Sequence, residues 1–521
     1  MAQKCFDGGV DGPGRIARVL VGDLLRRSAR RMPDRVALID GERQVTYQAL
    51  DRAANRLAHG LIARGLEPGQ RVATICVNSV ELAVAIFAIA RAGLIWVPIN
   101  LMLDARHVRF TLDHAGVALA LVDPQLAGHP ALGEQVRGLG LPVLLAEPDL
   151  PAFRGMPDDE PEVGLESGDI AAIVYTSGTT SMPKGAMHSH LSLVMSAMSN
   201  ALEWRLDRSD GVTLQLPLFH CAAHCILLAH LMVGARAVLM RRFEPEEMLR
   251  NIDRHRLTLV VGLPAMYEAM LDHPARGSYS TASLRLGHYA MAPMPEPLMR
   301  RMVAEFCPSF TLVSGQTEMY PVTTMSRPER QMERFGNYWG EGTVINDVAV
   351  MDEAGSLLPR GAAGELVHRG PNVMAGYYRD PEATAASRRH GWHHTGDIAR
   401  ITEANEVQFL DRTRDMIKTG GENVSSIQVE EQLLACEGVA AAAVVGLPHP
   451  HWGEAVTAFV KPRSGVPLTE ETVLQKVRDR LGRFQLPKRV VIVDDIPMTA
   501  TGKLRKVELR EAYAGLYREA G

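Results

Sequence analysis

The feature that most constrains the fold is the alternation of short apolar runs with amphipathic stretches, separated by glycine and proline. Arg71–Val77 precedes a helical pattern over Val80–Ala92. Ile170–Thr176 and Phe310–Ser314 are further apolar runs, and each ends at a glycine-containing turn. This rhythm predicts an α/β fold, in which ligands gather where loops leave the carboxyl ends of strands.

The texture changes after about residue 406, where the charged segment VQFLDRTRDMIKTGGEN begins. The patterns that follow it are a short helix (Gln428–Leu434) and two strands (Val439–Val445 and Ala455–Val460). We predict a large N-terminal domain over residues 1–412 and a small α+β C-terminal domain over residues 413–521, a normal domain size.

Composition excludes several classes of protein. The chain has 521 residues, 46% of them hydrophobic and 22% charged, which is typical of a globular enzyme and not of a disordered chain. Its net charge of −4 gives no broad basic face for nucleic acid or an anionic membrane. The six cysteines are scattered, and we expect neither a disulfide framework nor a signal peptide.

The longest apolar stretch, Glu81–Ile99, is interrupted by Arg91, Gly93 and Pro98. It predicts a buried helix followed by a strand rather than a membrane span. We therefore expect a cytoplasmic protein with no integral membrane segment. The proline-rich, acidic segment Glu147–Glu162 is expected to be a surface connection.

The segment Tyr175-Thr-Ser-Gly-Thr-Thr-Ser-Met-Pro-Lys-Gly185 is the first that suggests chemistry. Backbone N–H groups, five hydroxyl side chains and one lysine can together wrap a polyphosphate. It is not the P-loop of nucleotide triphosphatases, because Gly185 rather than Ser or Thr follows the lysine. A flexible surface turn is the alternative. The predicted phosphate-binding residues are Thr176, Ser177, Gly178, Thr179, Thr180 and Lys184.

Five further motifs follow in order. They are Pro217-Leu-Phe-His220, Ser314-Gly-Gln-Thr-Glu318, Trp392-His-His-Thr-Gly-Asp397, Arg412-Thr-Arg-Asp-Met-Ile-Lys-Thr-Gly-Gly421 and Pro497-Met-Thr-Ala-Thr-Gly-Lys503. In order and spacing, the six segments resemble the adenylate-forming superfamily of acyl-CoA synthetases, peptide-synthetase adenylation domains and firefly luciferase. The resemblance runs from about residue 20 to about residue 510. It implies an α/β architecture with a large multi-sheet N-terminal domain and a small mobile α+β C-terminal domain.

The resemblance also implies how ATP and Mg²⁺ are held. Asp397 and Arg412 are carried over to the ribose, Glu318 to the magnesium ion and Thr317 to the AMP phosphate. A carboxylate suits these roles, because it can accept hydrogen bonds from two hydroxyls or offer a hard oxygen to a dication. The remaining residues assigned to the nucleotide are Ala292, Pro293, Ser314, Gly315 and Gln316.

Lys503 is assigned the main catalytic role. Acyl adenylation brings a carboxylate oxygen against the α-phosphate, so two anions approach while charge builds on the phosphoryl oxygens. A point charge on a flexible stem can bridge both groups. Outside such a loop, a lysine after Thr-Gly would be a surface residue.

The second half-reaction needs a thiol to attack the acyl-adenylate. In the resembled family the small domain rotates about a hinge residue, which exchanges the catalytic lysine for a pantetheine tunnel. The matching hinge residue is Arg414, and Gly420 and Gly421 match the tunnel glycines, where a thin arm passes close to the backbone. A solvated charge run is the plainer interpretation of Arg412–Asp415, and the role of Lys418 is left open.

The segment His220-Cys-Ala-Ala-His224-Cys225 admits two interpretations. The cluster could suggest zinc, but the sequence offers no second ligand pair at a metal-like spacing and an apolar helical pattern follows directly. We favour an acyl pocket that His220 closes, as the resemblance implies. The residues assigned to this pocket are His220, Cys221, Ala222 and Met291, whereas His190, His224 and His230 are expected to be structural.

Two positions depart from the family pattern. Ser314 stands where an aromatic residue usually stacks on adenine, a contact that contributes about 1–3 kcal/mol, so weaker or compensated ATP binding is expected. Met291 replaces a glycine of the usual Gly-Gly-Ala-Pro strip and should shorten the pocket, whereas Ala222 and Ala223 open it. The changes act in opposite directions and do not identify the acid.

The sequence therefore predicts an ATP-dependent carboxylate–CoA ligase that forms an acyl-adenylate with release of pyrophosphate, and then an acyl-CoA thioester with release of AMP. A medium- or long-chain fatty acid is the first choice, and an aryl or arylpropenoic acid the second. Loading of a carrier protein, oxidation of the adenylate, and a catalytically silent nucleotide-binding scaffold are the alternatives. The expected cofactors and partners are ATP, Mg²⁺, coenzyme A and the acid, without nucleic acid; a homodimer is left open.

Overall fold

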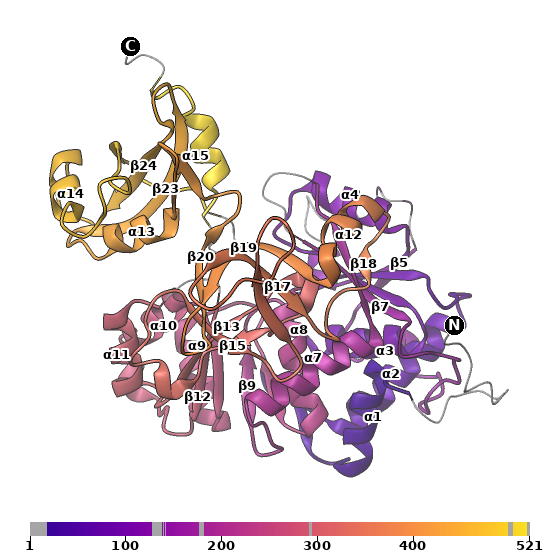
Figure 1. Cartoon of the computed structure of the whole chain (residues 1–521). Helices are drawn as coiled ribbons and strands as arrows, with labels where there is room; N and C mark the ends of the chain where they lie inside the picture. The colour runs from indigo at the N-terminus through magenta and orange to yellow at the C-terminus, as the bar shows by residue number, and fades with distance from the viewer. Residues whose placement is uncertain are drawn as a thin grey trace.

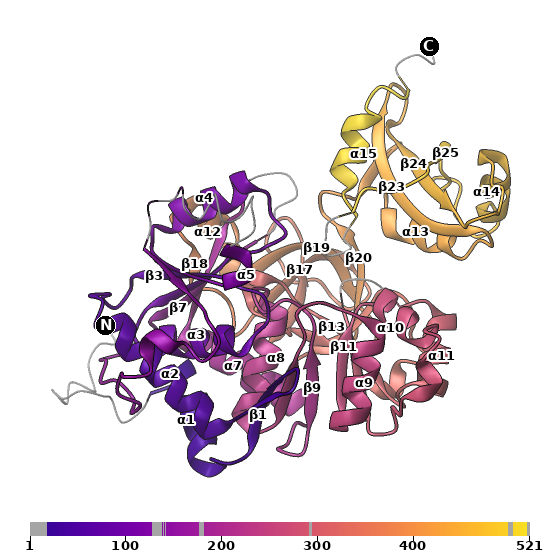
Figure 2. The same ribbon diagram turned by 180° about the vertical axis from the view of Figure 1, so that it is seen from behind.

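The structure is a computed structural model that describes residues 18–127, 138, 140, 142–176, 182–290, 294–498 and 504–517. Two parts are visible in Figure 1: a large body that carries most of the helices and strands, and a smaller orange and yellow C-terminal part set apart from it. Figure 2 shows the same separation from behind.

The large body contains a sheet of 13 described strands. In spatial order these are β16 (Asp347–Met351), β17 (Ala363–Arg369), β19 (His393–Ile401), β20 (Val407–Arg412), β15 (Tyr338–Gly342), β14 (Thr324–Met325), β13 (Phe310–Ser314), β12 (Leu286–Tyr289), β11 (Leu259–Gly262), β9 (Gly211–Leu214), β10 (Arg236–Leu239), β1 (Val36–Asp40) and β2 (Arg43–Thr46). The run from β13 to β1 is parallel, and the pairs on either side of it are antiparallel. The parallel part confirms the α/β prediction.

A second sheet of the same body has seven described strands. Their order is β18 (Gly376–Tyr377), β8 (Gly185–Ser189), β7 (Ile170–Tyr175), β4 (Ile95–Pro98), β3 (Arg71–Ile75), β5 (Val117–Val122) and β6 (Val143–Leu145). The strands from β7 to β6 are parallel, whereas β8 is antiparallel to β7 and to β18. The predicted phosphate segment therefore connects two antiparallel strands.

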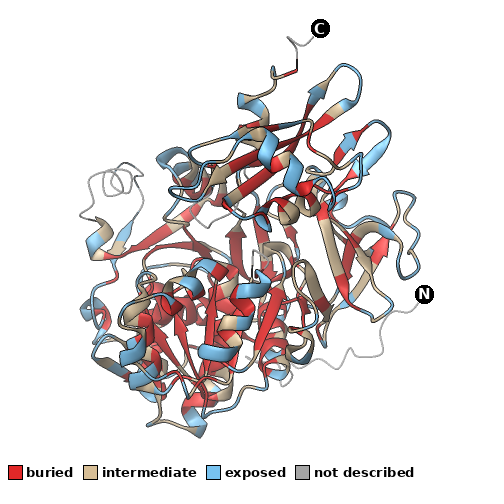
Figure 3. Ribbon diagram, turned by 90° about the vertical axis from the view of Figure 1, so that its left-hand side faces the viewer, coloured by how far each residue is buried: buried red, intermediate tan, exposed pale blue. Residues whose placement is uncertain are grey.

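One group of helices shares a hydrophobic core with both sheets. It consists of α1 (Val21–Arg31), α2 (Tyr47–Ile62), α3 (Val80–Arg91), α7 (His190–Glu203) and α8 (Cys221–Val233). The outer helices are α9 (Pro245–His255), α10 (Pro264–Leu271) and α11 (Glu296–Glu305) on the large sheet, and α4 (Ala105–Ala115), α5 (Pro124–Ala127) and α12 (Pro381–Ala386) near the second sheet. Figure 3 shows the consequence: the strands are mostly buried and the outer helix faces are exposed.

The C-terminal part has its own sheet and its own cores. Its strands are β21 (Ile417–Thr419), β22 (Glu422–Val424), β23 (Val439–His449), β24 (Gly453–Pro462) and β25 (Arg489–Ile492), and its helices are α13 (Ser426–Leu434), α14 (Glu470–Val477) and α15 (Lys506–Ala512). The structure thus confirms the predicted fold, with a large part of several sheets and a small α+β part. The boundary between residues 412 and 413 stays a prediction, although β20 is the last strand of the large sheet and β21 the first of the small one.

The segment Glu147–Glu162 is more than the surface connection that the sequence predicts. Leu150 and Phe153 are buried, and the carboxylate of Glu160 forms ion pairs with Arg18 and Arg26 at 3.1 and 3.2 Å. A proline-rich, acidic composition could not show these contacts, because the partners lie more than a hundred residues away.

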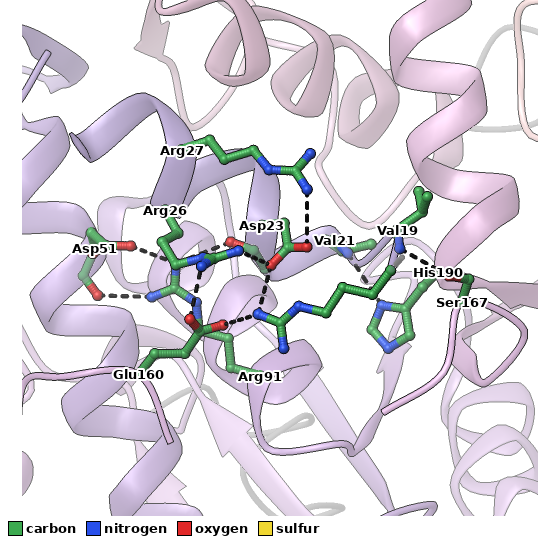
Figure 4. Close-up of polar contacts among 12 residues, drawn as sticks. Val19, Val21, Asp23, Arg26, Arg27, Asp51, Arg91, Glu160, Ser167 and His190 are labelled. Atoms are coloured by element: carbon green, nitrogen blue, oxygen red, sulfur yellow. Dashed lines mark hydrogen bonds and ion pairs between the residues drawn. The ribbon is translucent and has the colours of Figure 1, made fainter. Parts of the chain in front are cut away.

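Arg91 joins the first three helices (Figure 4). Its guanidinium nitrogens lie 2.5 Å from an Asp51 carboxylate oxygen and 2.6 Å from the Asn55 side-chain oxygen, and it donates to the Gly22 carbonyl at 3.1 Å. The arginine that interrupts the long apolar stretch is therefore a buried link between α1, α2 and α3. The predicted helix followed by a strand is confirmed as α3 and β4, and no helix in the described ranges is long and apolar enough to cross a bilayer.

Candidate active site

The predicted phosphate segment starts and ends at adjacent backbone positions. The Thr176 N–H donates to the Lys184 carbonyl at 2.9 Å, where β7 and β8 meet. This pairing fixes both ends of the loop between the two strands. The predicted residues Ser177, Gly178, Thr179 and Thr180 lie outside the described residues.

Lys184 and Glu318 come together around Tyr377. The Tyr377 hydroxyl donates to Glu318 Oε1 at 2.8 Å, and Lys184 Nζ lies 5.2 Å from the centre of the tyrosine ring. Lys184 Nζ is also 4.0 Å from an Asp380 carboxylate oxygen. Tyr377 was not predicted, because it lies 59 residues from Glu318 and only the pairing of β18 with β8 brings it to the site.

The motif Ser314–Glu318 follows the carboxyl end of β13. The Ser314 carbonyl accepts a hydrogen bond from the Thr323 N–H at 2.9 Å, which turns the chain back beside the motif. Gly315 is required for this turn, since a Cβ atom there would lie 2.7 Å from Pro321 Cβ. The motif is thus held by its own return strand as well as by β13.

Two buried histidines contact this motif or the residues directly after it. His188 Nε2 donates to the Thr317 carbonyl at 2.8 Å, and His224 Nδ1 is hydrogen-bonded to the Tyr320 hydroxyl. Burial lowers the pKa of His188 to about 4 and that of His224 to about 3, so both imidazoles are neutral at pH 7. The expectation that His224 is structural agrees with this contact, while the role of His188 was missed.

Tyr320 belongs to the same buried group. Its φ of +38° is unusual for a residue with a side chain, and the surrounding contacts hold it there. Its carbonyl accepts a hydrogen bond from the Ser196 hydroxyl at 2.9 Å, and its side chain is fully buried. The backbone after Glu318 is therefore held in one conformation.

The acyl-pocket candidates lie at the start of α8. His220 is the N-terminal flanking residue of this helix, and Cys221 Sγ lies 3.7 Å from Thr317 Oγ1. The predicted pocket and the predicted nucleotide motif are therefore neighbours. Cys225 Sγ donates to the Ala222 carbonyl. Met291, Ala292 and Pro293 lie outside the described residues.

Asp397, Arg412 and Gln316 form one hydrogen-bonded group. Asp397 on β19 stands opposite Arg412 on β20, with 3.1 Å between Asp397 Oδ1 and Arg412 Nε. Gln316 donates to Asp397 Oδ2 at 2.8 Å and to the Thr395 carbonyl at 2.8 Å. Three residues taken from three separate motifs thus meet beside Thr317 and Glu318.

Lys503 lies outside the described residues, and the remaining predicted residues, Arg414, Gly420 and Gly421, lie in the C-terminal part. Gly420 and Gly421 form the two-residue turn between β21 and β22, with φ of +59° and +88°. A type I′ turn requires positive φ at both positions, so the hairpin alone accounts for both glycines. Gly420 also donates to the Trp452 carbonyl at 2.9 Å, and Arg414 Nε lies 3.9 Å from Asp415. A tunnel and a hinge stay predictions.

Comparison with known proteins identifies the family. The profile of the AMP-binding enzyme matches residues 25–378, and that of the AMP-binding enzyme C-terminal domain matches residues 428–503. The chain belongs to the AMP-binding enzyme family. The predicted resemblance is thereby confirmed.

Two relatives within the AMP-binding enzyme family cover nearly the whole chain. A feruloyl-CoA synthase from an Amycolatopsis species is 36% identical over 490 residues, which are 94% of this chain and 98% of that protein. A long-chain-fatty-acid–CoA ligase from Mycobacterium tuberculosis is 32% identical over 501 residues, 95% of this chain and 98% of that protein. The predicted enzyme class, an AMP-forming acyl-CoA synthetase, is confirmed with the family.

Two solved structures of this family are similar over the whole chain. ATP-bound MatB from Rhodopseudomonas palustris has a TM-score of 0.86 and 30% identity, with 95% of this chain and 99% of that chain covered. The o-succinylbenzoate-CoA synthetase from Bacillus subtilis, in complex with ATP and a magnesium ion, has a TM-score of 0.84 and 26% identity, with 93% and 98% covered. The similarity confirms the predicted fold, while the cytoplasmic location and the oligomeric state stay predictions.

Proposed function

We propose that this synthetase activates a monocarboxylic acid with ATP and transfers the acyl group to coenzyme A. In the first step a carboxylate oxygen attacks the α-phosphorus, the bond to the β-phosphate oxygen breaks, and pyrophosphate leaves. In the second step the CoA sulfur, having lost its proton, attacks the acyl carbon and AMP leaves. The observation that carries the proposal is the group formed by Asp397, Arg412 and Gln316 beside Thr317 and Glu318.

We assign the nucleotide roles around this group. Asp397 suits the ribose hydroxyls, because each oxygen of a carboxylate accepts hydrogen bonds, and Arg412 lies beside it. Thr317 is assigned to the AMP phosphate. Thr176, Lys184 and the segment between them are assigned to the other phosphates, and Ala292, Pro293, Ser314, Gly315 and Gln316 to the adenine side.

Glu318 fits a magnesium ion. Tyr377 donates to one of its two carboxylate oxygens, and an oxygen donor is what a hard dication prefers. When bound with ATP, the ion neutralises charge on the phosphates. Glu318 would hold the ion, and Tyr377 would hold Glu318.

We propose that Lys503 stabilises the carboxylate and the α-phosphate as these two anions approach each other. Lys503 belongs to the C-terminal domain proposed for residues 413–521. Arg414 is the proposed hinge between that domain and residues 1–412. Gly420 and Gly421 are the proposed walls of the pantetheine tunnel. The relatives named CoA synthase and CoA ligase support coenzyme A over a carrier protein as the acceptor.

The acid is proposed to have an apolar body. Cys221, Ala222 and Ala223 open α8 with small, uncharged side chains, and the neutral His188 and His224 behind them offer no positive charge to a second carboxylate. A medium- or long-chain fatty acid fits these properties and remains the first choice. An arylpropenoic acid is the second candidate, which the 36% identity to a feruloyl-CoA synthase supports.

The test is release of pyrophosphate against a panel of fatty, aryl, arylpropenoic, short-chain and dicarboxylic acids, each with and without CoA. We expect release with one class of apolar monocarboxylic acid and sustained turnover only when CoA is present. Release that stops near one equivalent with CoA present would contradict CoA as the acceptor. A preference for a dicarboxylic acid would contradict the proposed acid.

Lys503→Ala tests the catalytic assignment within the same assay. Because charge stabilisation at the phosphoryl oxygens is lost, we expect adenylation to fall by several orders of magnitude while ATP still binds in calorimetry. Lys461→Ala is the matched control: Lys461 is a lysine of the same domain, on the surface, 2.9 Å from Asp495. Unchanged adenylation by Lys503→Ala would refute the assignment.

A further inference from the structure

Helix α15 holds the chain segment that connects the two parts of the molecule. This segment, residues 411–415, leaves β20 of the large sheet and leads to β21 of the small one. Lys506 and Arg510 lie four residues apart on α15 and therefore on one face of it. Both side chains reach toward residues 411–415.

Lys506 is a buried cation in a continuous polar chain. Its Nζ lies 2.8 Å from Glu430 Oε1 and donates to Ser426 Oγ at 2.6 Å. The Ser426 hydroxyl in turn donates to Asp411 Oδ2 at 2.7 Å. Lys506 is only 8% exposed and the other three residues are equally or more buried. This series of polar contacts thus connects α15, through α13, to strand β20 of the large sheet.

Asp411 is the member of this chain that belongs to the large sheet. It lies next to Arg412 and opposite Ile398, one step along from the Asp397–Arg412 pair. Its carboxylate also accepts the Ser426 N–H at the start of α13, at 2.6 Å. Burial raises the pKa of Asp411 and of Glu430, and Lys506 counteracts that effect for both. The cation therefore helps to keep two buried carboxylates ionised.

Arg510 holds the other end of the segment. Its Nη2 lies 2.6 Å from Asp415 Oδ1, and Asp415 directly follows Arg414. The Asp415 N–H also donates to the Arg412 carbonyl at 2.9 Å. Arg510 therefore contacts residue 415 directly and Lys506 is linked to residue 411 through Ser426, on the two sides of the proposed hinge.

We propose that Lys506 and Arg510 are positioning residues for the adenylation half-reaction, because they fix helix α15 relative to the strand that carries Arg412. The inference rests on the proposed function, since it gives Lys503 its role. Lys503 stands three residues before Lys506 in the sequence. The contacts with residues 411–415 thus fix the helix that follows Lys503 in the sequence.

The first experiment separates the two half-reactions. For Lys506→Met and for Arg510→Met, we expect acid-dependent exchange of pyrophosphate into ATP to fall at least tenfold. Thioester formation from a supplied acyl-adenylate and CoA should change by less than twofold. Equal loss of both half-reactions, or loss of neither, would overturn the proposal. Lys506→Arg should recover part of the exchange rate, and Lys461→Met is the control that should leave both reactions unchanged.

A second variant guards against simple misfolding. Lys506→Met leaves Glu430 as a buried carboxylate without its cation, which is strongly destabilising. The double variant Lys506→Met/Glu430→Gln removes the cation and one of the two buried carboxylates, and its thermal midpoint should lie above that of Lys506→Met. The proposal expects the exchange defect to persist in it, because the link to Asp411 is still cut. Full recovery of exchange would show that Lys506 acts only on stability.

The third measurement does not depend on activity. The cysteines of the described ranges are all buried, so spin labels attach selectively at Glu353→Cys and Asp479→Cys in a Cys5→Ser background. We expect Lys506→Met to broaden the distribution of distances between the two labels. An unchanged distribution would refute the proposed role of α15 in holding residues 411–415, whether or not the enzyme acts on an acid of the panel. Broadening in a chain that activates no acid would support that role and refute the proposed function.

Discussion

At the scale of single residues, one hydroxyl group contacts the carboxylate that is proposed to hold magnesium. Tyr377 donates to Glu318 at 2.8 Å, and its ring also faces Lys184. A hydrogen bond to a charged acceptor contributes about 1.5–3 kcal/mol. Since the hydroxyl and the ring contact different partners, the two contributions can be separated by removing the hydroxyl alone.

Tyr377→Phe should weaken the use of Mg²⁺ while leaving the ring in place. Without its hydrogen-bond donor the Glu318 carboxylate is free to rotate, so we expect the Mg²⁺ concentration for half-maximal exchange to rise about tenfold, as about 1.4 kcal/mol implies. Binding of Mn²⁺ in the presence of ATP, followed by electron paramagnetic resonance, should weaken in parallel. Tyr279→Phe is the matched control, because the Tyr279 hydroxyl donates to Glu246 at 2.9 Å on the outer helix layer; equal effects of both variants would contradict the assignment.

This hydrogen bond also marks what sequence reasoning could not reach. The motifs that resemble the family single out Asp397, Arg412 and Gln316, and the structure brings these three side chains together. Tyr377 and His188 lie 59 and 129 residues from the groups they bind. Nothing in a local pattern specifies a contact over such a separation.

At the scale of elements, α1, α2 and α3 are joined by Arg91 at their meeting point (Figure 4). The side chain is 1% exposed and reaches Asp51, Asn55 and the Gly22 carbonyl. Gly22 allows the close approach, since a Cβ atom there would lie 2.8 Å from Arg91 Cγ. A buried arginine with several acceptors fixes the mutual orientation of the helices more than a single apolar side chain could.

Arg91→Met should lower the free energy of unfolding by about 3–5 kcal/mol, because it leaves the Asp51 carboxylate without its cation in a largely buried place. Arg109→Met removes an exposed pair with Asp113 and should change the same quantity by only about 0.5 kcal/mol. Guanidinium unfolding curves of both variants measure the difference. Similar values for the two would contradict a structural role for the buried pair.

The bounds of elements show where periodic patterns succeed. Phe310–Ser314 was predicted as a strand and β13 has those bounds, since a fully buried parallel strand is a continuous apolar run. Helix α13 begins two residues before the predicted Gln428, because Ser425 accepts the Gln428 N–H as a cap. Strand β23 extends beyond Val445 to His449, because its hairpin partner continues to pair there. A hydrophobic pattern predicts which residues form the core, but it does not predict caps or pairing partners.

At the scale of the whole molecule, neutral histidines are distributed through the interior. Burial lowers the pKa of each of them from the usual 6.5. The values are about 4 for His188 and His230, and about 3 for His224, His288 and His368. They lie on strands of both sheets of the large body and on helix α8.

The free energy of unfolding should therefore fall as the pH decreases from 6.5 toward 5. In this range the unfolded chain takes up protons on these imidazoles and the folded chain does not, so acid favours unfolding. The stabilisation is fully present above pH 6.5 and is lost as the pH falls toward the folded pKa values. Denaturant midpoints at pH 7, 6 and 5 measure it, and His230→Leu should reduce the slope by about one proton. A flat profile in the unsubstituted chain would contradict this.

The position of β1 in the large sheet has a consequence for biosynthesis. Leu38 pairs with Ala237, 199 positions later in the chain, and β1 has only the short β2 on its other side. At roughly 5–20 residues per second, the hairpin of β1 and β2 waits about 10–40 s on the ribosome before its parallel neighbour β10 emerges. A two-stranded hairpin is marginal alone in water. The nascent chain thus presents an unfinished apolar edge to the cell, and chaperones that bind extended apolar segments should contact residues 36–46 until the middle of the chain has been made.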